Sequence, residues 1–292
     1  MKKSIFFINV YGCPEVSGDL DKMFSLMKKA GATGLQFHIS ELMNLDADKF
    51  KELLSENGAY VECVHVTPRL LCDDEEIFAA AIKECEDALE YISSFGCKRL
   101  MVVPFTPSDV KDRNEARERF AKGLGFVVKS AEKYGISVVI ENISQLTLPF
   151  STADDIEYLL DNVKGLTFCF DTGNFVCTKA DAVSSYEKLK DRIDMVHVKD
   201  FGICESGGFA CDSGINVEHV DFGTGDANLV EVLHLLYKNS PNVPYVVEVH
   251  NAMPPKDDVV KACDFTELCI FISVNKNLNA VYIGKAAKRI ND

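Results

Sequence analysis

Four residues of metal-binding types each close a short apolar run between residues 136 and 248. Three of them carry a carboxylate and one carries an imidazole, which makes an oxygen-rich ligand set with a single nitrogen. Such a set suits Mn²⁺, Mg²⁺ or Co²⁺, and it is also compatible with Zn²⁺. The four residues are Glu141, Asp171, His197 and Glu248. We expect them to bind one divalent metal ion together.

The runs that end in these residues have the composition of buried parallel strands. They are short and rich in Val, Ile and Phe, as expected for strands covered on both faces. In a closed β/α barrel, the carboxyl ends of all strands open onto the face that carries the active site. Residues far apart in the sequence would therefore meet at that face.

The whole chain alternates strand-like and helix-like segments, with no linker of low complexity between them. The expected strands cover residues 4–10, 34–39, 59–66, 99–104, 136–141, 166–171, 193–197 and 245–248. Eight such units predict the α/β class and a single (β/α)₈ TIM barrel that spans residues 1–292 as one domain. An open doubly wound sheet is the alternative, but no GxGxxG motif follows the first strand. Residues 200–222 are expected to form a long glycine-rich loop, and residues 257–290 the last helix or two.

Composition narrows the classes of partner and the compartment. The net charge of −14 argues against a nucleic-acid partner. No apolar segment is long enough for a membrane span, and the short apolar start is interpreted as a strand rather than a signal peptide. The 11 cysteines are odd in number, scattered and without a CxxC pair, so we expect a reducing, cytoplasmic setting. The oligomeric state stays open, with a homo-oligomer among the options.

The ends of the last four strands resemble the xylose-isomerase-like superfamily of sugar isomerases and epimerases. The resemblance implies a divalent metal that holds two oxygens of an open-chain sugar, with two glutamates on either side of the carbon that loses its proton. It rests on the motifs Glu141-Asn142, Asp171-Thr172-Gly173-Asn174, His197-Val198-Lys199-Asp200 and Gly223-Thr224-Gly225-Asp226, and on Glu248. The backbone amides near Gly223 stand before an expected helix and are candidates to meet an anion.

This chemistry explains the residue types. Proton removal beside a carbonyl creates an enediolate, whose charge a metal stabilises as a Lewis acid. Glu141 and Glu248 are the expected catalytic acid and base as well as metal ligands, whereas Asp171 and His197 are expected to be ligands only. The expected partners of a small sugar or polyol-derived substrate are His65, Asn174, Lys199 and His219.

Departures from the family pattern leave the exact reaction open. Asn174 stands where the strand-six histidine of ketohexose epimerases contacts sugar, and no arginine lies between His197 and Gly223. Inosose-type dehydration and hydroxypyruvate-type isomerisation therefore remain alternatives, as does a non-catalytic ligand-binding barrel. Apurinic-site endonucleases share the barrel but need further zinc ligands. Here Val217 replaces the aspartate of their Asp-x-His motif, which argues against DNA repair.

Overall fold

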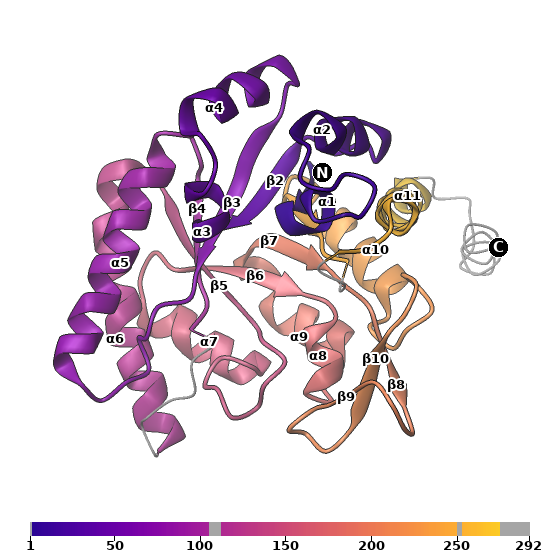
Figure 1. The fold of residues 1–292 in the computed structure, drawn as a ribbon. Coiled ribbons are helices and arrows are strands. Elements are labelled where there is room, and N and C mark those ends of the chain that lie inside the picture. The colour runs from indigo at the N-terminus through magenta and orange to yellow at the C-terminus, as the bar shows by residue number, and fades with distance from the viewer. Residues whose placement is uncertain (1, 105–111, 250–252, 275–292) are drawn as a thin grey trace.

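The computed structural model describes residues 2–104, 112–249 and 253–274, and its centre is a closed barrel of parallel strands (Figure 1). The strand order around the barrel is β1-β11-β7-β6-β5-β4-β3-β2. The predicted (β/α)₈ barrel is thus confirmed. Its strands are β1 (Lys3–Phe6), β2 (Gly34–His38), β3 (Tyr60–Val66), β4 (Arg99–Val102), β5 (Ser137–Glu141), β6 (Thr167–Asp171), β7 (Ile193–Val198) and β11 (Tyr245–Val247).

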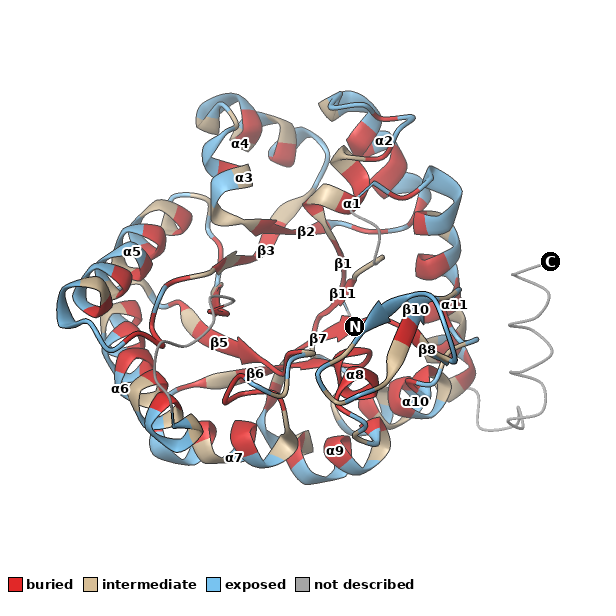
Figure 2. Ribbon diagram, turned by 60° about the horizontal axis from the view of Figure 1, so that its bottom comes forward, coloured by how far each residue is buried: buried red, intermediate tan, exposed pale blue. Residues whose placement is uncertain are grey.

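Amphipathic helices surround the barrel, and Figure 2 shows that their buried residues face the strands. Most helices begin where a side chain accepts a hydrogen bond from the first turn, which satisfies an otherwise free backbone N–H group. The helix predicted over residues 153–162 is confirmed with both ends, and Thr152 forms its capping box. The longer helices are α2 (Leu20–Lys29), α4 (Ala47–Glu56), α5 (Glu75–Ser93), α6 (Arg113–Ala131), α7 (Ala153–Asn162), α9 (Ala182–Leu189), α10 (Leu229–Asn239) and α11 (Lys256–Val274). None of the helices in the described ranges is long and apolar enough to cross a membrane.

The first strand is shorter than predicted, because the chain turns into helix α1 (Phe7–Tyr11) after Phe6. The Phe7 ring stacks on Phe37 with centroids 4.5 Å apart. The Asn9 side chain donates to the carbonyl of Val249 at 2.8 Å and accepts from its N–H at 3.0 Å. The periodicity of a short apolar run does not distinguish a strand from a buried helix. Here the tertiary contacts of Phe7 and Asn9 favour the helix.

Residues 201–219 hold a small antiparallel sheet where a loop was predicted. Its strands lie in the order β8 (Phe201–Cys204), β10 (Asn216–His219) and β9 (Phe209–Ala210), outside the barrel wall (Figure 1). Two of the glycines that indicated a loop, Gly207 and Gly208, lie in the turn between β8 and β9. Gly208 has a φ of +60°, and a Cβ there would lie 2.2 Å from the carbonyl oxygen of Val217.

Partly buried ion pairs lie at the amino-terminal end of the barrel. Arg99, at the start of β4, contacts Glu62 at 2.6 Å and Asp194 at 2.8 Å. These residues come from three different strands, β3, β4 and β7. The pairs tie the strands together at the end opposite to the quartet of metal-binding residues.

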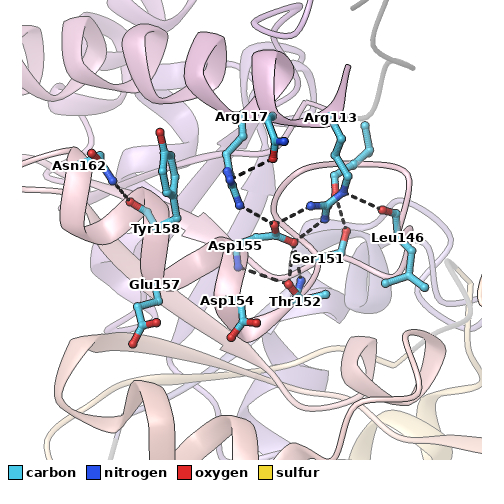
Figure 3. Close-up of polar contacts among 12 residues, drawn as sticks. Arg113, Arg117, Leu146, Ser151, Thr152, Asp154, Asp155, Glu157, Tyr158 and Asn162 are labelled. Carbon is cyan, nitrogen blue, oxygen red and sulfur yellow. Dashed lines mark hydrogen bonds and ion pairs between the residues drawn. The ribbon is translucent and has the colours of Figure 1, made fainter. Parts of the chain in front are cut away.

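A second buried carboxylate braces the loop that follows β5 (Figure 3). Arg113 of α6 contacts both oxygens of Asp155, at 2.7 and 2.5 Å, and it donates to the carbonyls of Leu146 and Leu148. Burial alone would raise the pKa of Asp155, but the hydrogen bonds from Arg113 and Thr152 outweigh it and hold the pKa below its ordinary value. This clamp fixes the segment that leads away from Glu141.

We expect Asp155→Asn to lower the free energy of unfolding by about 2–3 kcal/mol at pH 7, because it leaves Arg113 without its buried counter-charge. Asp154→Asn is the matched control, since the Asp154 side chain is 84% exposed, and it should cost less than about 0.5 kcal/mol. Urea unfolding measures both. A carboxylate with a lowered native pKa stabilises the fold above its unfolded pKa and loses that effect as the pH falls through the native value. The cost of Asp155→Asn should therefore shrink in acid, and equal costs for the two variants at pH 7 would contradict the clamp.

Candidate metal centre

The four predicted metal-binding residues meet at the carboxyl ends of adjacent strands. Glu141 ends β5, Asp171 ends β6, His197 lies near the end of β7, and Glu248 directly follows β11. Register pairs Asp171 with His197, and one ligand atom from each of the four residues lies within 4.8 Å of the others. A single ion could therefore reach all four side chains. That they bind one stays a prediction.

His197 turns one ring nitrogen toward all three carboxylates. Its Nδ1 lies 2.6 Å from Oε1 of Glu141, 3.6 Å from Oε2 of Glu248 and 3.8 Å from Oδ2 of Asp171. The other nitrogen, Nε2, lies 2.9 Å from Oε1 of Gln36. An amide oxygen only accepts, so Nε2 carries the hydrogen and the lone pair of a neutral ring lies on Nδ1. Burial lowers the pKa of His197 to about 4, which leaves the ring neutral at pH 7.

Asp171 provides a test of whether this set fits a metal. Its Oδ1 accepts a hydrogen bond from the backbone N–H of Asn174 at 2.7 Å. Its buried Oδ2 accepts no hydrogen bond from the described residues, and Lys199 Nζ lies 3.2 Å away as an ion-pair partner. A buried carboxylate oxygen without a donor is costly unless a cation meets it. This oxygen accepts no hydrogen bond from the described residues and faces Nδ1 of His197 at 3.8 Å, so the pair fits a divalent ion.

Burial disfavours the charged form of two of the carboxylates. It raises the pKa of Asp171 to about 6 and that of Glu141 to about 7. Cys169 also lies within reach of Glu141 and His197, but burial raises the pKa of its thiol well above the ordinary value. A protonated thiol is a poor ligand, so the set with three carboxylates is the better metal site.

Asn142 holds the ends of β5 and β6 together. Its side chain donates to the carbonyl of Asp171 at 3.0 Å and accepts from the N–H of Asp171 at 2.9 Å. Its own carbonyl accepts from the side chain of Asn174 at 2.9 Å. The sequence analysis names Asn142 as part of a motif but predicts no role for it. In the structure, its hydrogen bonds position Glu141 and Asp171 relative to each other.

A cavity of about 260 Å³ adjoins the two glutamates of the quartet, and three of the four predicted substrate-binding residues line it. These are His65, Asn174 and Lys199, and Glu141 and Glu248 line the same cavity. Nδ1 of His65 is buried and has no hydrogen-bond partner among the residues that the structure describes. The sequence prediction did not include Gln36, Met101 or Ser144, which also line the cavity. The available sequence signal for Gln36 was a polar residue inside an apolar run, and the structure shows that it is fully buried.

His219 lies elsewhere. It is on β10 and lines a second cavity, of about 270 Å³, with Asp200, Asp221 and Phe222. It is not among the described residues that line the cavity at the quartet, so its role in substrate binding stays a prediction without support from its position.

The amides near Gly223 meet an anion that belongs to the chain itself. The carboxylate of Asp200 accepts from the N–H groups of Gly223, Gly225 and Ala227 at 2.8, 3.1 and 3.3 Å. A Cβ at position 225 would lie 2.4 Å from Oδ1 of Asp200, which explains the glycine. The turn therefore anchors the segment after β10 to the end of β7.

A family model described as xylose isomerase-like TIM barrel matches residues 24–269. The chain belongs to this family. Among curated proteins it is similar to a putative hydroxypyruvate isomerase of Caenorhabditis elegans, with 23% identity over 134 residues. That match covers 43% of this chain and spans about half (51%) of the relative's length.

Solved structures with the xylose isomerase-like fold superpose over nearly the whole chain. D-psicose 3-epimerase from Clostridium cellulolyticum H10, solved with D-tagatose, gives a TM-score of 0.73 at 16% identity and covers 92% of this chain and 99% of its own. A protein named IOLI, solved with a zinc atom, gives 0.74 at 16% identity, with 94% and 99% covered. At these identities the likeness establishes the fold alone.

We expect Mn²⁺ to bind this family member with one ion per chain in calorimetric titration, and Asp171→Ala to abolish the binding. Asp154→Ala, on the exposed surface, should leave it unchanged. Protons compete for Glu141 and Asp171, whose pKa values are raised to about 7 and 6, so affinity should fall as the pH drops from 8 to 6. Binding that survives Asp171→Ala would place the metal elsewhere.

Gln36 should tune this binding through His197. We expect Gln36→Met to weaken Mn²⁺ affinity by about tenfold or more, because the Nε2 hydrogen loses its acceptor and the ring loses its orientation. Gln36→Glu retains an acceptor oxygen and should retain most of the affinity. Equal losses in the two variants would show that Gln36 acts through packing alone.

Proposed function

We propose that this chain is a divalent-metal-dependent isomerase or epimerase that acts on a small sugar or a related hydroxy-carbonyl compound. The observation that supports this most directly is the quartet, whose ligand atoms lie within 4.8 Å of one another, with two glutamates lining the adjoining cavity. Family membership and the epimerase named among the structural neighbours agree with it.

In this proposal, Glu141, Asp171, His197 and Glu248 hold the metal, which would supply Lewis-acid stabilisation of negative charge on substrate oxygen. One glutamate takes the proton from the carbon beside the carbonyl, and an enediolate forms. In an epimerase, the other glutamate returns a proton to the opposite face of the same carbon. In an aldose–ketose isomerase, the proton goes to the neighbouring carbon instead.

His65 is suited to hold a substrate hydroxyl. Burial lowers its pKa to about 3, so the ring is neutral at pH 7, and its Nδ1 has no partner within the described protein. Asn174 and Lys199 are engaged by other protein groups, so any substrate contact they make would be shared with those groups.

The described wall of the cavity favours a compound with few hydroxyl groups. Phe6, Met101, Val103 and Ile143 give it an apolar side, and a hydroxyl buried against that side without a partner would weaken binding. This observation, with the relative named putative hydroxypyruvate isomerase, makes isomerisation of a short keto compound the second candidate beside ketose epimerisation.

Solvent deuterium exchange separates the candidates. The Mn²⁺-loaded protein is incubated in D₂O with ketoses, inososes and hydroxypyruvate, and the products are examined by NMR. Epimerisation labels and inverts one carbon, isomerisation moves the carbonyl, and dehydration releases water and leaves an unsaturated or dicarbonyl product. A protein that binds Mn²⁺ but exchanges no proton in any of these compounds would instead fit the ligand-binding barrel.

We expect Glu141→Gln and Glu248→Gln each to lower turnover by about 10² or more, because the amide keeps an oxygen ligand but cannot accept the proton. Glu187→Gln is the control, because Glu187 is half-exposed on α9 and is not among the described residues that line the cavity. Calorimetry should show that both site variants largely retain the metal. A one-base isomerase would tolerate one substitution much better than the other, and near-normal turnover in both variants would refute the two-carboxylate mechanism.

A further inference from the structure

Lys199 places an ammonium group among the oxygens that the metal would use. Its Nζ lies 2.6 Å from Oε1 of Glu248 and 3.2 Å from Oδ2 of Asp171, and its side chain is 7% exposed. We propose that Lys199 is an internal cation that competes with the divalent metal, so that it sets the metal affinity and holds the carboxylates together without metal. This inference rests on the proposed function only in taking the quartet as the metal centre.

The backbone of Lys199 is fixed so that its side chain must enter the site. Its N–H donates to Oγ1 of Thr172 at 2.9 Å, and the Thr172 hydroxyl donates to its carbonyl at 2.6 Å. The aliphatic stem crosses Gly173, where a Cβ would lie 2.8 Å from Cγ of Lys199. The Asp171-Thr172-Gly173 segment therefore both supplies a ligand and guides the lysine toward it.

The charges explain why the lysine matters. When the three carboxylates are ionised, their like charges repel within a buried site, and one ammonium offsets part of that cost. Of the described residues that line the cavity, Lys199 is the one with a permanent positive charge. A divalent ion bound to Oδ2 of Asp171 would lie close to this ammonium, and two cations at such a distance repel.

The two contacts of Lys199 respond differently to a metal. Its contact with Asp171 uses Oδ2, the oxygen that faces Nδ1 of His197. Its contact with Glu248 uses Oε1, whereas Oε2 of Glu248 faces His197. The lysine can therefore give up Asp171 to a metal and keep Glu248. The ammonium stays near the site and continues to lower the affinity.

The test is calorimetric titration of Lys199→Met with Mn²⁺. We expect a dissociation constant at least tenfold lower than that of the unchanged protein, and a lower midpoint of thermal unfolding in chelator that Mn²⁺ restores. Lys3→Met is the matched control, because Lys3 is also buried but contacts Ala30 and Glu267 at the amino end of β1. It should leave the Mn²⁺ affinity within about twofold while removing the same charge.

A dissociation constant that is unchanged or higher in Lys199→Met overturns the proposal, as does the absence of Mn²⁺ binding in both proteins. If Lys199→Met does not fold, the same titration of Gly173→Ala tests the proposal. The added Cβ at position 173 would displace the stem of Lys199 without removing a charge. Tighter binding supports the proposal and unchanged binding overturns it. Failure of the proposed function looks different: tighter Mn²⁺ binding by the variant with no proton exchange in any substrate leaves the role of Lys199 intact.

Discussion

Three carboxylates lie within a few ångströms of one another in a buried site, and much of the surrounding structure compensates their charge. The raised pKa values of Glu141 and Asp171 show that the protein environment by itself favours protonation there. The ammonium of Lys199 offsets part of the charge. A divalent cation, if bound as proposed, would offset the remaining charge, so the four residues and the groups that support them act together.

The barrel backbone brings the four side chains together. Each ligand stands at the carboxyl end of its own strand, and the hydrogen bonds between parallel strands fix the relative height of those ends. The loops then need only to fix the segments that follow the strand ends. The clamp of Arg113 on Asp155 and the carboxylate of Asp212, which accepts from the N–H groups of Leu146 and Thr147, brace the segment after β5 from two sides.

The sequence was sufficient to predict the fold and the convergence of the four quartet residues, because the carboxyl ends of all strands in a β/α barrel open onto one face. Metal binding by the quartet stays a prediction. The sequence was insufficient wherever a contact between distant segments decides the structure. Helix α1 depends on Asn9 meeting Val249, and the amides near Gly223 bind Asp200 rather than a ligand. The antiparallel sheet forms from a glycine-rich segment that reads as a loop in the sequence. His219 lies on this sheet and lines the second cavity. Gln36 has a role only once β2 and β7 face each other across the barrel.

Burial divides the quartet into two pairs, and this division agrees with the roles proposed for them. Asp171 and His197 are fully buried and each is held by hydrogen bonds from the frame, through Asn174 and Gln36. Side chains fixed in this way cannot move with a substrate, and such rigidity suits metal ligands. Glu141 and Glu248 line the cavity, and the Glu248 side chain is 21% exposed. A proton-transfer group must reach the substrate and exchange with solvent between turnovers, so the two glutamates have the access that this work requires and the other pair does not.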